Sequence, residues 1–361
     1  MFARARIGID LGVSLLCTLY YILLSMSIID HLTIKAESAK KLASVGISLA
    51  NSLYKRPLLI LFRGELGAGK TTFIQGLAGG LGVKAKVVSP TYALEQRYGQ
   101  TLSHIDLYRL SGTQAKEFVR DLEEFEGVRA IEWAERESAM KGDINISIGE
   151  DSTGGRVINI ECRDIKIPGE ADIAKWQKEV HLPSHIAAHT KAVADLSMKI
   201  ADYLTGRGTV VRKKALYAAA LMHDLLRFVD FKSWGASDAY TPTDADRKVW
   251  TAMKEKYGTP HETAAEKFLV AHGYPEVGFI VRPHRGFDLD LMQPLPLLTT
   301  EQIVLCYADK RVNLDKVVTV DERFDDFMVR YSHGQEAAPG KAWREHMKRV
   351  EAELFPEGVP F

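Results

Sequence analysis

A glycine-rich segment at residues 64–72, GELGAGKTT, carries the residue types that bind phosphate. Its glycines let backbone N–H groups turn inward around an anion, Lys70 reaches the β- and γ-phosphate oxygens, and the Thr71 hydroxyl ligates magnesium. An apolar run at 58–62 predicts a buried strand before the segment, and residues 72–81 predict a helix whose positive end faces the anion. The expected nucleotide-binding residues are Gly64, Glu65, Gly67, Ala68, Gly69, Lys70, Thr71 and Thr72.

Two acidic residues stand at the ends of later apolar runs. Asp106 follows a run at 103–105, and Glu132 closes a run that begins at Val128. Because the carboxyl ends of parallel strands form the edge where such sheets bind ligands, both side chains are expected beside the phosphate-binding segment. A phosphate-binding loop of this kind needs a carboxylate to hold magnesium or to position water. Asp106 and Glu132 are therefore predicted to be catalytic and to serve the metal.

A second set of candidate residues, in the C-terminal half, consists of histidines and aspartates. His223 and Asp224 are adjacent in an otherwise apolar run at 218–227, where a buried charged pair is costly unless a metal or another partner compensates it. Imidazole with carboxylate and without thiolate suits iron, manganese, zinc, nickel or magnesium rather than a structural zinc knot, and we expect a divalent transition metal such as Mn²⁺, Fe²⁺ or Zn²⁺. The candidate metal ligands are His189, His223, Asp224, His261, His284 and Asp309.

The elements that must position these residues divide the chain into two parts. From residue 57 to about 167, short apolar runs alternate with helical stretches, which indicates an α/β sheet with helices on its faces. The polar stretch at 168–183 predicts a linker, and the pattern from Ser184 onward is nearly all helical. We therefore expect an α/β P-loop NTPase-like domain at 27–167 and an all-α domain at 184–355. A length of 361 residues agrees with two domains.

Residues 1–26 form an apolar N-terminal extension. The run at 7–24 follows Arg4 and Arg6 and is interrupted by Asp10. Export would separate a nucleotide-binding loop from its nucleotide, so a secretory signal is disfavoured. Two interpretations remain: a membrane anchor, or an extension that precedes a true start at Met26. We prefer the second, and with it a cytoplasmic protein without stable membrane association unless residues 7–24 are an anchor.

Charge and cysteine content exclude two further classes of protein. Lys plus Arg and Asp plus Glu number 47 each, so no net field draws nucleic acid to the whole molecule, and any such contact needs a local patch or a partner. The three cysteines, Cys17, Cys162 and Cys306, are far apart and lack the spacing of a disulfide framework or a thiolate zinc site. We expect them to be reduced and mostly buried.

Four motifs of the N-terminal half occur in the order found in the TsaE family. They are GELGAGKTT at 64–72, SPTY at 89–92, HIDLYR at 104–109 and IEWAER at 131–136. Over residues 27–165 the chain resembles that family. The resemblance implies an ATPase with ATP and Mg²⁺ as ligands, serving synthesis of N6-threonylcarbamoyladenosine at position 37 of tRNA. It further implies the TsaD and TsaB proteins as partners, with tRNA met indirectly through them.

The same resemblance implies roles for individual residues. Lys70 and Thr71 would hold the nucleotide and magnesium, and Thr91 would lie on a switch-like loop near the nucleotide. Asp106 would serve the metal, and Glu132 would position water.

The histidines and aspartates of the C-terminal half resemble the HD superfamily of metal-dependent phosphohydrolases over about residues 181–330. The similarity lies in the order of His189, the His223-Asp224 pair, His261, His284 and Asp309. It implies a divalent metal site in which Asp224 is catalytic. Arg227, one helical turn after His223, is expected to contact substrate phosphate.

These motifs leave three functional hypotheses open. The first is an ATPase component of tRNA modification that carries a metal-dependent phosphohydrolase on the same chain. The second is a nucleotide phosphohydrolase or phosphodiesterase that its P-loop domain regulates. The third is a scaffold whose helical half binds metal or nucleotide without turnover.

Overall fold

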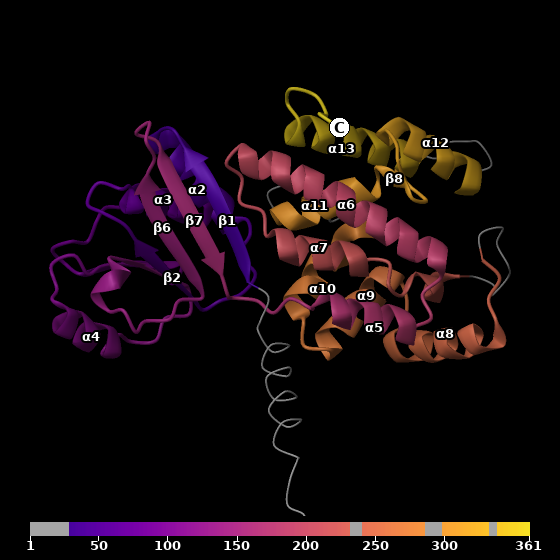
Figure 1. Cartoon of the computed structure of the whole chain (residues 1–361), viewed down its shortest axis with the longest axis horizontal. Coiled ribbons are helices and arrows are strands. Elements are labelled where there is room, and N and C mark those ends of the chain that lie inside the picture. Colours follow the sequence, from indigo (N-terminus) through magenta and orange to yellow (C-terminus); the bar gives the residue numbers. More distant parts are fainter. Residues whose placement is uncertain (1–28, 232–239, 286–297, 332–337) are drawn as a thin grey trace, which may run out of the picture.

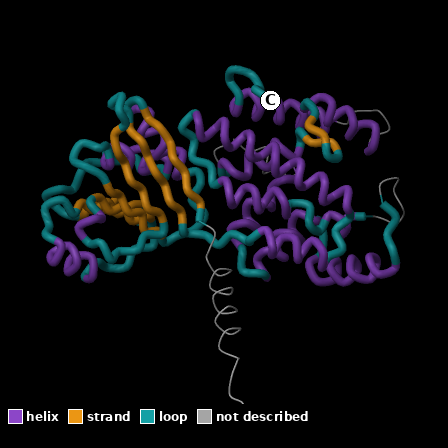
Figure 2. Tube along the Cα trace, viewed as in Figure 1, coloured by secondary structure: helices purple, strands orange, loops and turns teal. Residues whose placement is uncertain are grey.

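The structure, a computed structural model, describes residues 29–231, 240–285, 298–331 and 338–361. In these ranges the chain forms a sheet domain and a helical domain, on the left and right of Figure 1. The strands of the first and the helices of the second separate clearly in Figure 2, which confirms the expected fold classes. The predictions for residues 1–26 and for Cys17 lie outside the described residues. No helix among the described residues is long and apolar enough to span a membrane.

The N-terminal domain is built on a seven-stranded sheet with the order β1-β7-β6-β2-β5-β4-β3. Strand β2 is central and parallel to β5 and β6, β4 is parallel to β5, and β1, β7 and β3 pair antiparallel with their neighbours. The strands are β1 (Asp30–Ala36), β2 (Leu58–Arg63), β3 (Glu95–Tyr98), β4 (Leu102–Asp106), β5 (Val128–Glu132), β6 (Ile144–Glu150) and β7 (Arg156–Cys162).

Helices cover both faces of this sheet. Because strand side chains alternate, Ile60 and Ala130 join the core under α2 (Ala39–Ala50) and α3 (Lys70–Gly80), whereas Leu61 and Ile131 join a smaller core. Helix α4 (Gly112–Arg120) and the 3₁₀ turn η1 (Ala134–Arg136) contribute Ala115 and Ala134 to the smaller core.

Strand β1 is an element that the sequence analysis did not predict. Its residues alternate strictly between buried and exposed, with Leu32 and Ile34 buried, and it pairs along its whole length with β7. The strand lies between the apolar extension and the first recognised motif. Its alternation of apolar and polar residues is short, so it was not recognised as a strand in the sequence. It forms the edge of the sheet that lies nearest the helical domain (Figure 1).

The C-terminal domain consists almost entirely of helices around a single large core. Its helices are α5 (Glu170–Glu179), α6 (Ser184–Gly206), α7 (Lys213–Met222), α8 (Asp244–Tyr257), α9 (His261–Ala271), α10 (Pro275–Val281), α11 (Thr300–Asp309), α12 (Val320–Tyr331) and α13 (Ala338–Leu354). Two 3₁₀ turns and one pair of very short strands complete it: η2 (Arg227–Asp230), η3 (Arg282–Arg285), β8 (Val312–Asn313) and β9 (Lys316–Val317).

The prediction of a linker at 168–183 was wrong. This segment contains α5, and its Ile173 and Trp176, one helical turn apart, are buried in the core of the helical domain. The Trp176 ring makes edge contacts with Phe268 and His272. The segment is polar in composition because most residues of α5 lie on its solvent face. Two large apolar side chains are enough to pack the other face against the core.

The two described cysteines agree with the expectation of buried thiols. Cys162 closes β7 and Cys306 lies in α11, and both are buried and free. Burial raises the pKa of each thiol to about 12, so neither forms a reactive thiolate near neutral pH.

Close packing of α2 on α3 depends on glycine. A Cβ atom at Gly76 of α3 would lie 1.9 Å from the carbonyl oxygen of Ala43, and one at Gly46 of α2 would lie 2.2 Å from that of Phe73. Both contacts are with backbone atoms, which cannot move aside as a side chain would. The two helices therefore approach at backbone distance.

We expect Gly76→Ala to lower the free energy of unfolding by about 3 kcal/mol, the upper end of the range for overpacking, because α2 and α3 must separate. Gly79→Ala, on the same helix, is the matched control, since a Cβ there meets no atom within 4 Å. The control should be stabilised by about 0.5–1 kcal/mol, because alanine orders more easily than glycine in a helix. Chemical denaturation of both variants measures these values, and equal effects would contradict the packing argument.

Candidate functional site

The phosphate-binding loop lies between β2 and α3, where the sequence placed it. Gly64, Gly67 and Gly69 all have positive φ angles, 140°, 80° and 101°. A Cβ at Gly64 would lie 2.3 Å from the carbonyl oxygen of Ile148, so the turn requires glycine there. Gly69 caps α3 without a side-chain hydrogen bond, which leaves the first N–H groups of the helix directed toward an anion.

Lys70 is held inside this loop. Its side chain is buried, and its ammonium donates hydrogen bonds to the carbonyl oxygens of Gly64 (2.6 Å) and Glu65 (3.0 Å). The ammonium also lies 3.8 Å from the centroid of the Trp133 ring. Burial lowers the pKa of Lys70, although nearby carboxylates, with Glu132 foremost, oppose that effect. The lysine thus carries a poorly solvated positive charge at the point where phosphate would enter.

The two predicted carboxylates make different contacts. Asp106 and Glu132 are register partners at the ends of β4 and β5. Glu132 Oε1 accepts a hydrogen bond from the Thr71 hydroxyl at 2.7 Å. Asp106 Oδ2 instead accepts from Ser89 (3.0 Å) and Thr91 (2.5 Å) in the loop that follows α3. Glu132 therefore lies beside the hydroxyl that is predicted to ligate magnesium, and Asp106 lies beside the loop that contains Thr91.

His104 is a residue of this site that the sequence analysis did not select. It is fully buried, and its Nε2 lies 2.9 Å from Glu132 Oε1. Because an ionised carboxylate only accepts hydrogen bonds, Nε2 must be the donor, and the imidazole fixes the orientation of Glu132. The sequence did offer one indication of this role. His104 lies two residues before Asp106 in the same predicted strand, and residues two apart in a strand point to the same face of a sheet.

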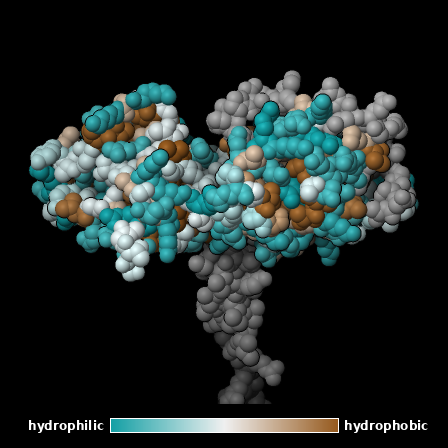
Figure 3. All heavy atoms as spheres, turned by 90° about the horizontal axis from the view of Figure 1, so that it is seen from above, coloured by the Kyte–Doolittle hydropathy of each residue, from teal (hydrophilic) through white to brown (hydrophobic). Residues whose placement is uncertain are grey.

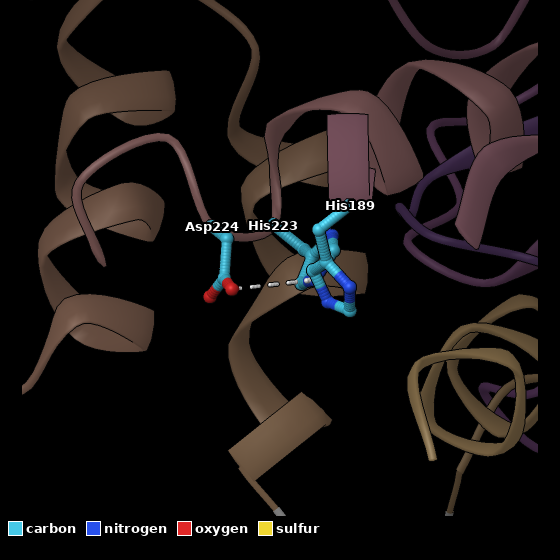
Figure 4. Close-up of side chains that lie close together, drawn as sticks. All are labelled: His189, His223 and Asp224. Carbon is cyan, nitrogen blue, oxygen red and sulfur yellow. Dashed lines mark ion pairs between the residues drawn. The ribbon is translucent and has the colours of Figure 1, made fainter. Parts of the chain in front are cut away.

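The helical domain brings its histidines and aspartates together at the ends of several helices. His189 projects from α6, while His223 and Asp224 follow the last turn of α7, as Figure 4 shows. Donor atoms of these three residues lie within 4.8 Å of one another. Asp309, the last residue of α11, completes the group, with Oδ1 3.0 Å from His189 Nε2 and 3.7 Å from His223 Nε2.

Asp224 connects this group to a second one. Its Oδ2 lies 3.8 Å from His223 Nε2, while its Oδ1 lies 2.9 Å from His261 Nε2 and 3.6 Å from His284 Nε2. Asp224, His261 and His284 themselves form a cluster of potential ligand atoms within 4.8 Å. All six predicted ligands therefore meet in one place, which we call the metal centre, and the two oxygens of Asp224 face its two halves. That arrangement suits a carboxylate that bridges two cations.

Three of these imidazoles form a hydrogen bond through Nδ1 to a backbone carbonyl oxygen, so their Nε2 atoms face the metal centre. His189 is held by the carbonyl oxygen of Leu314 (2.8 Å), His223 by that of Ala220 (2.7 Å) and His284 by that of Val281 (2.6 Å). Such a carbonyl contact fixes the tautomer that leaves Nε2 free to bind metal.

Asp230 serves His261 as the carbonyl oxygens serve the other imidazoles. Its Oδ2 lies 2.6 Å from His261 Nδ1, and carboxylate-held imidazoles are common behind metal ligands. The sequence analysis missed Asp230, because nothing in its local pattern distinguishes it from a solvated turn residue.

The donor set fits a divalent cation. His223 Nε2 is buried, faces two carboxylates and has no hydrogen-bond partner among the described residues. Burial by itself would raise the pKa of Asp224, but the positive charges of His223 and His261 hold it well below the usual range. Burial by itself would lower the pKa of His223, but Asp224 and Asp309 raise it. A cation that replaces these imidazole protons would satisfy the carboxylates and Nε2 together.

Cationic side chains border the metal centre. Arg227 Nη1 lies 2.9 Å from His261 Nδ1, and its side chain is about one-third exposed (36%), so the predicted phosphate contact lies at the rim. Lys310 is buried and donates hydrogen bonds to Asp309 and to the carbonyl oxygen of His284 (3.1 Å). The two basic side chains differ in role. Lys310 is hydrogen-bonded to predicted metal ligands, whereas Arg227 is partly exposed to solvent.

Manganese should raise the melting temperature of the full chain, because a cation that binds only the folded metal centre stabilises it. His223→Ala should lower the affinity for Mn²⁺ at least about 10-fold. His272→Ala is the matched control, because that imidazole bonds to the carbonyl oxygen of Phe268 and stacks on its ring within the helical core. The measurement is the melting temperature across a manganese titration at saturating Mg²⁺. Equal manganese affinity in His223→Ala and the wild type would show that manganese does not bind at this cluster.

Comparisons with known proteins find one family model in each domain. The family model described as threonylcarbamoyl adenosine biosynthesis protein TsaE matches residues 36–158, and that of the HD domain matches residues 186–314. The first range contains the glycine-rich loop with Asp106 and Glu132, and the second contains all six predicted metal ligands.

Several relatives carry the name tRNA threonylcarbamoyladenosine biosynthesis protein TsaE. The protein of Haemophilus influenzae is 33% identical over 38% of this chain and 84% of its own length. That of Treponema pallidum is 34% identical over 35% of this chain and 96% of its own length. That of Synechocystis is 41% identical over 22% of this chain and 55% of its own length. A crystal structure of YdiB from Bacillus is 26% identical, with a TM-score of 0.30, over 37% of this chain and 87% of that one.

Proposed function

Because this chain belongs to the TsaE family of tRNA threonylcarbamoyladenosine biosynthesis proteins and also carries an HD domain, we propose that it is an ATPase of that pathway joined to a metal-dependent phosphohydrolase. The two activities would use separate residues. The observation that carries the first is the contact of Glu132 with Thr71, and the one that carries the second is Asp224 between two groups of imidazoles.

In the sheet domain, ATP would bind with its phosphates in the loop of Gly64 to Gly69. Lys70 and the N-terminus of α3 would neutralise phosphate charge. Thr71 and Glu132 would hold Mg²⁺, since the carboxylate already contacts the hydroxyl. Asp106, which contacts Ser89 and Thr91, would couple the switch-like loop to the nucleotide and orient water. This assignment exchanges the roles that the family resemblance suggested for the two acids.

His104 would act as a positioning residue in this mechanism. A carboxylate that both accepts from Thr71 and ligates magnesium needs a fixed orientation, and the buried imidazole supplies one. Trp133, against Lys70, would shield the same region from water.

In the helical domain, His189, His223, Asp224, His261, His284 and Asp309 would hold one or two divalent cations such as Mn²⁺, Fe²⁺ or Zn²⁺. Bound cations would supply Lewis acidity toward a phosphoryl group. Arg227 at the rim would bind a substrate phosphate, and Asp230 would keep His261 oriented. These groups favour a phosphoester or pyrophosphate substrate.

Partner binding is supported by apolar side chains that are exposed near the nucleotide loop. Leu66 is 72% exposed within the loop itself, and Tyr92 is 84% exposed in the segment that contacts Asp106. We propose that TsaD and TsaB bind this surface, and that tRNA is reached through them. Large apolar side chains exposed beside a functional loop are typical of protein contact sites.

Phosphate release from a panel of nucleotides and phosphoesters, with Mg²⁺ and Mn²⁺, distinguishes the two sites. Lys70→Ala should abolish ATP hydrolysis by the P-loop and leave manganese-dependent release unchanged, because Lys70 belongs to a separate domain. Asp224→Ala should do the reverse, with a loss of about 1000-fold or more, since it removes a shared ligand. If every activity disappears with Lys70→Ala alone, the helical domain is a binding module.

The tRNA role has its own test in a bacterium depleted of its TsaE protein. We expect the wild-type chain and Asp224→Ala to restore threonylcarbamoyladenosine in total tRNA, measured by mass spectrometry of nucleosides. Lys70→Ala should fail to restore it, because the loop loses the ammonium that neutralises phosphate charge. Equal restoration by Lys70→Ala and the wild type would separate this chain from ATP-dependent tRNA modification.

A further inference from the structure

Arg212, just before α7, is fully buried at the junction of the two domains. Its guanidinium forms two hydrogen bonds to Asp164, at 2.7 and 3.2 Å, and an ion pair with Asp30 at 3.4 Å. Asp30 begins β1 and Asp164 follows β7, so both carboxylates come from the edge of the sheet domain. Arg212 is therefore a residue of the helical domain whose charge the sheet domain compensates.

Glu301, in the first turn of α11, is a buried carboxylate of the helical domain that accepts hydrogen bonds from residues of the sheet domain. It is fully buried and accepts hydrogen bonds from the backbone N–H of Arg212 (2.6 Å), the Ser52 hydroxyl (3.1 Å) and the Tyr54 hydroxyl. Ser52 and Tyr54 follow α2 in the sheet domain. The residues of this junction network are Asp30, Ser52, Tyr54, Asp164, Arg212 and Glu301.

Two helices lead from the junction network to the metal centre. Helix α7 starts directly after Arg212 and is followed by His223 and Asp224. Helix α11 contains Glu301 in its first turn and ends with Asp309. Each helix has ten residues, so the two ends are about 15 Å apart. Side by side in the helical domain, they carry three of the six ligands (Figure 1).

On the other side, α2 connects the junction network to the nucleotide loop. It packs on α3 at backbone distance through Gly46 and Gly76, and α3 begins at Lys70. Its outer side is bound to the segment before Arg212, because Ser48 Oγ accepts a hydrogen bond from the N–H of Val210 at 2.8 Å. Figure 3 shows the two domains as lobes joined at a waist. Helices α7 and α11, the junction network and the packed pair α2 and α3 therefore form a continuous connection between the metal centre and the nucleotide loop.

We propose that the junction network couples the two sites, so that a divalent cation at the metal centre raises the affinity of the P-loop for nucleotide, and nucleotide raises the affinity for the cation. This inference rests on the proposed function, since it needs both sites to bind. A cation fixes the far ends of α7 and α11 against each other, which orders the near ends that hold α2. Nucleotide then meets a loop and helix that are already ordered, and linkage requires the effect to be reciprocal.

The test measures the dissociation constant of a fluorescent ADP analogue from the full chain at saturating Mg²⁺, with and without Mn²⁺. We expect Mn²⁺ to tighten binding about fivefold or more in the wild type. His223→Ala, whose metal centre is disabled, should show no such effect, which excludes exchange of Mn²⁺ into the nucleotide site.

Variants of the junction network decide the mechanism. Tyr54→Phe removes one hydroxyl bonded to Glu301, and Glu301→Gln removes the charge. Both should bind ADP and Mn²⁺ separately but lose most of the fivefold effect. Tyr257→Phe, a buried tyrosine of the helical core outside the junction network, is the matched control and should keep it.

Equal ADP affinity with and without Mn²⁺ in a wild type that binds both would overturn the coupling alone. The same conclusion follows if Tyr54→Phe and Glu301→Gln retain the full effect. A wild type that fails to bind Mn²⁺ by calorimetry would overturn the proposed metal site, and the coupling with it.

Discussion

The buried guanidinium of Arg212 is the constraint on which the arrangement of this molecule depends. A charge removed from water is tolerated only when partners of good geometry replace the solvent, and loss of one partner typically costs about 3–5 kcal/mol. Here Asp164 and Asp30 belong to one domain and the guanidinium to the other. The ion pairs of Arg212 with Asp30 and Asp164 therefore cross the junction, and separating the two domains would expose or unpair these buried groups.

Both candidate sites are built where regular elements end. The P-loop joins the end of β2 to the start of α3, and Asp106 and Glu132 close neighbouring strands. In the helical domain, His223 and Asp309 stand at the C-terminal ends of their helices. Such ends are anchored by the core on one side and open to a ligand on the other. The backbone contributes directly, through helix N–H groups at one site and carbonyl oxygens behind imidazoles at the other.

The donor sets of the two candidate sites favour different cations. A hydroxyl and a carboxylate, Thr71 and Glu132, suit the hard magnesium ion that accompanies nucleotides. Four imidazoles around Asp224 and Asp309 suit transition metals. The proposed sites would therefore not compete for the same cation, and the junction keeps the helices of the two domains in contact.

The sequence by itself determined the parts of this protein that depend on neighbouring residues. Residues 64–72 specify their loop because the glycines, Lys70 and Thr71 act within one turn. The six candidate metal ligands were selected by residue type and order, and the structure brings their side chains together. The tertiary structure alone decided the contacts between distant segments. Four features depend on such contacts: strand β1, the packing of α5, the pairing of His104 with Glu132 and the burial of Arg212. A charged or polar residue is solvated in most sequences, and whether it is buried depends on which segments, far apart along the chain, pack around it.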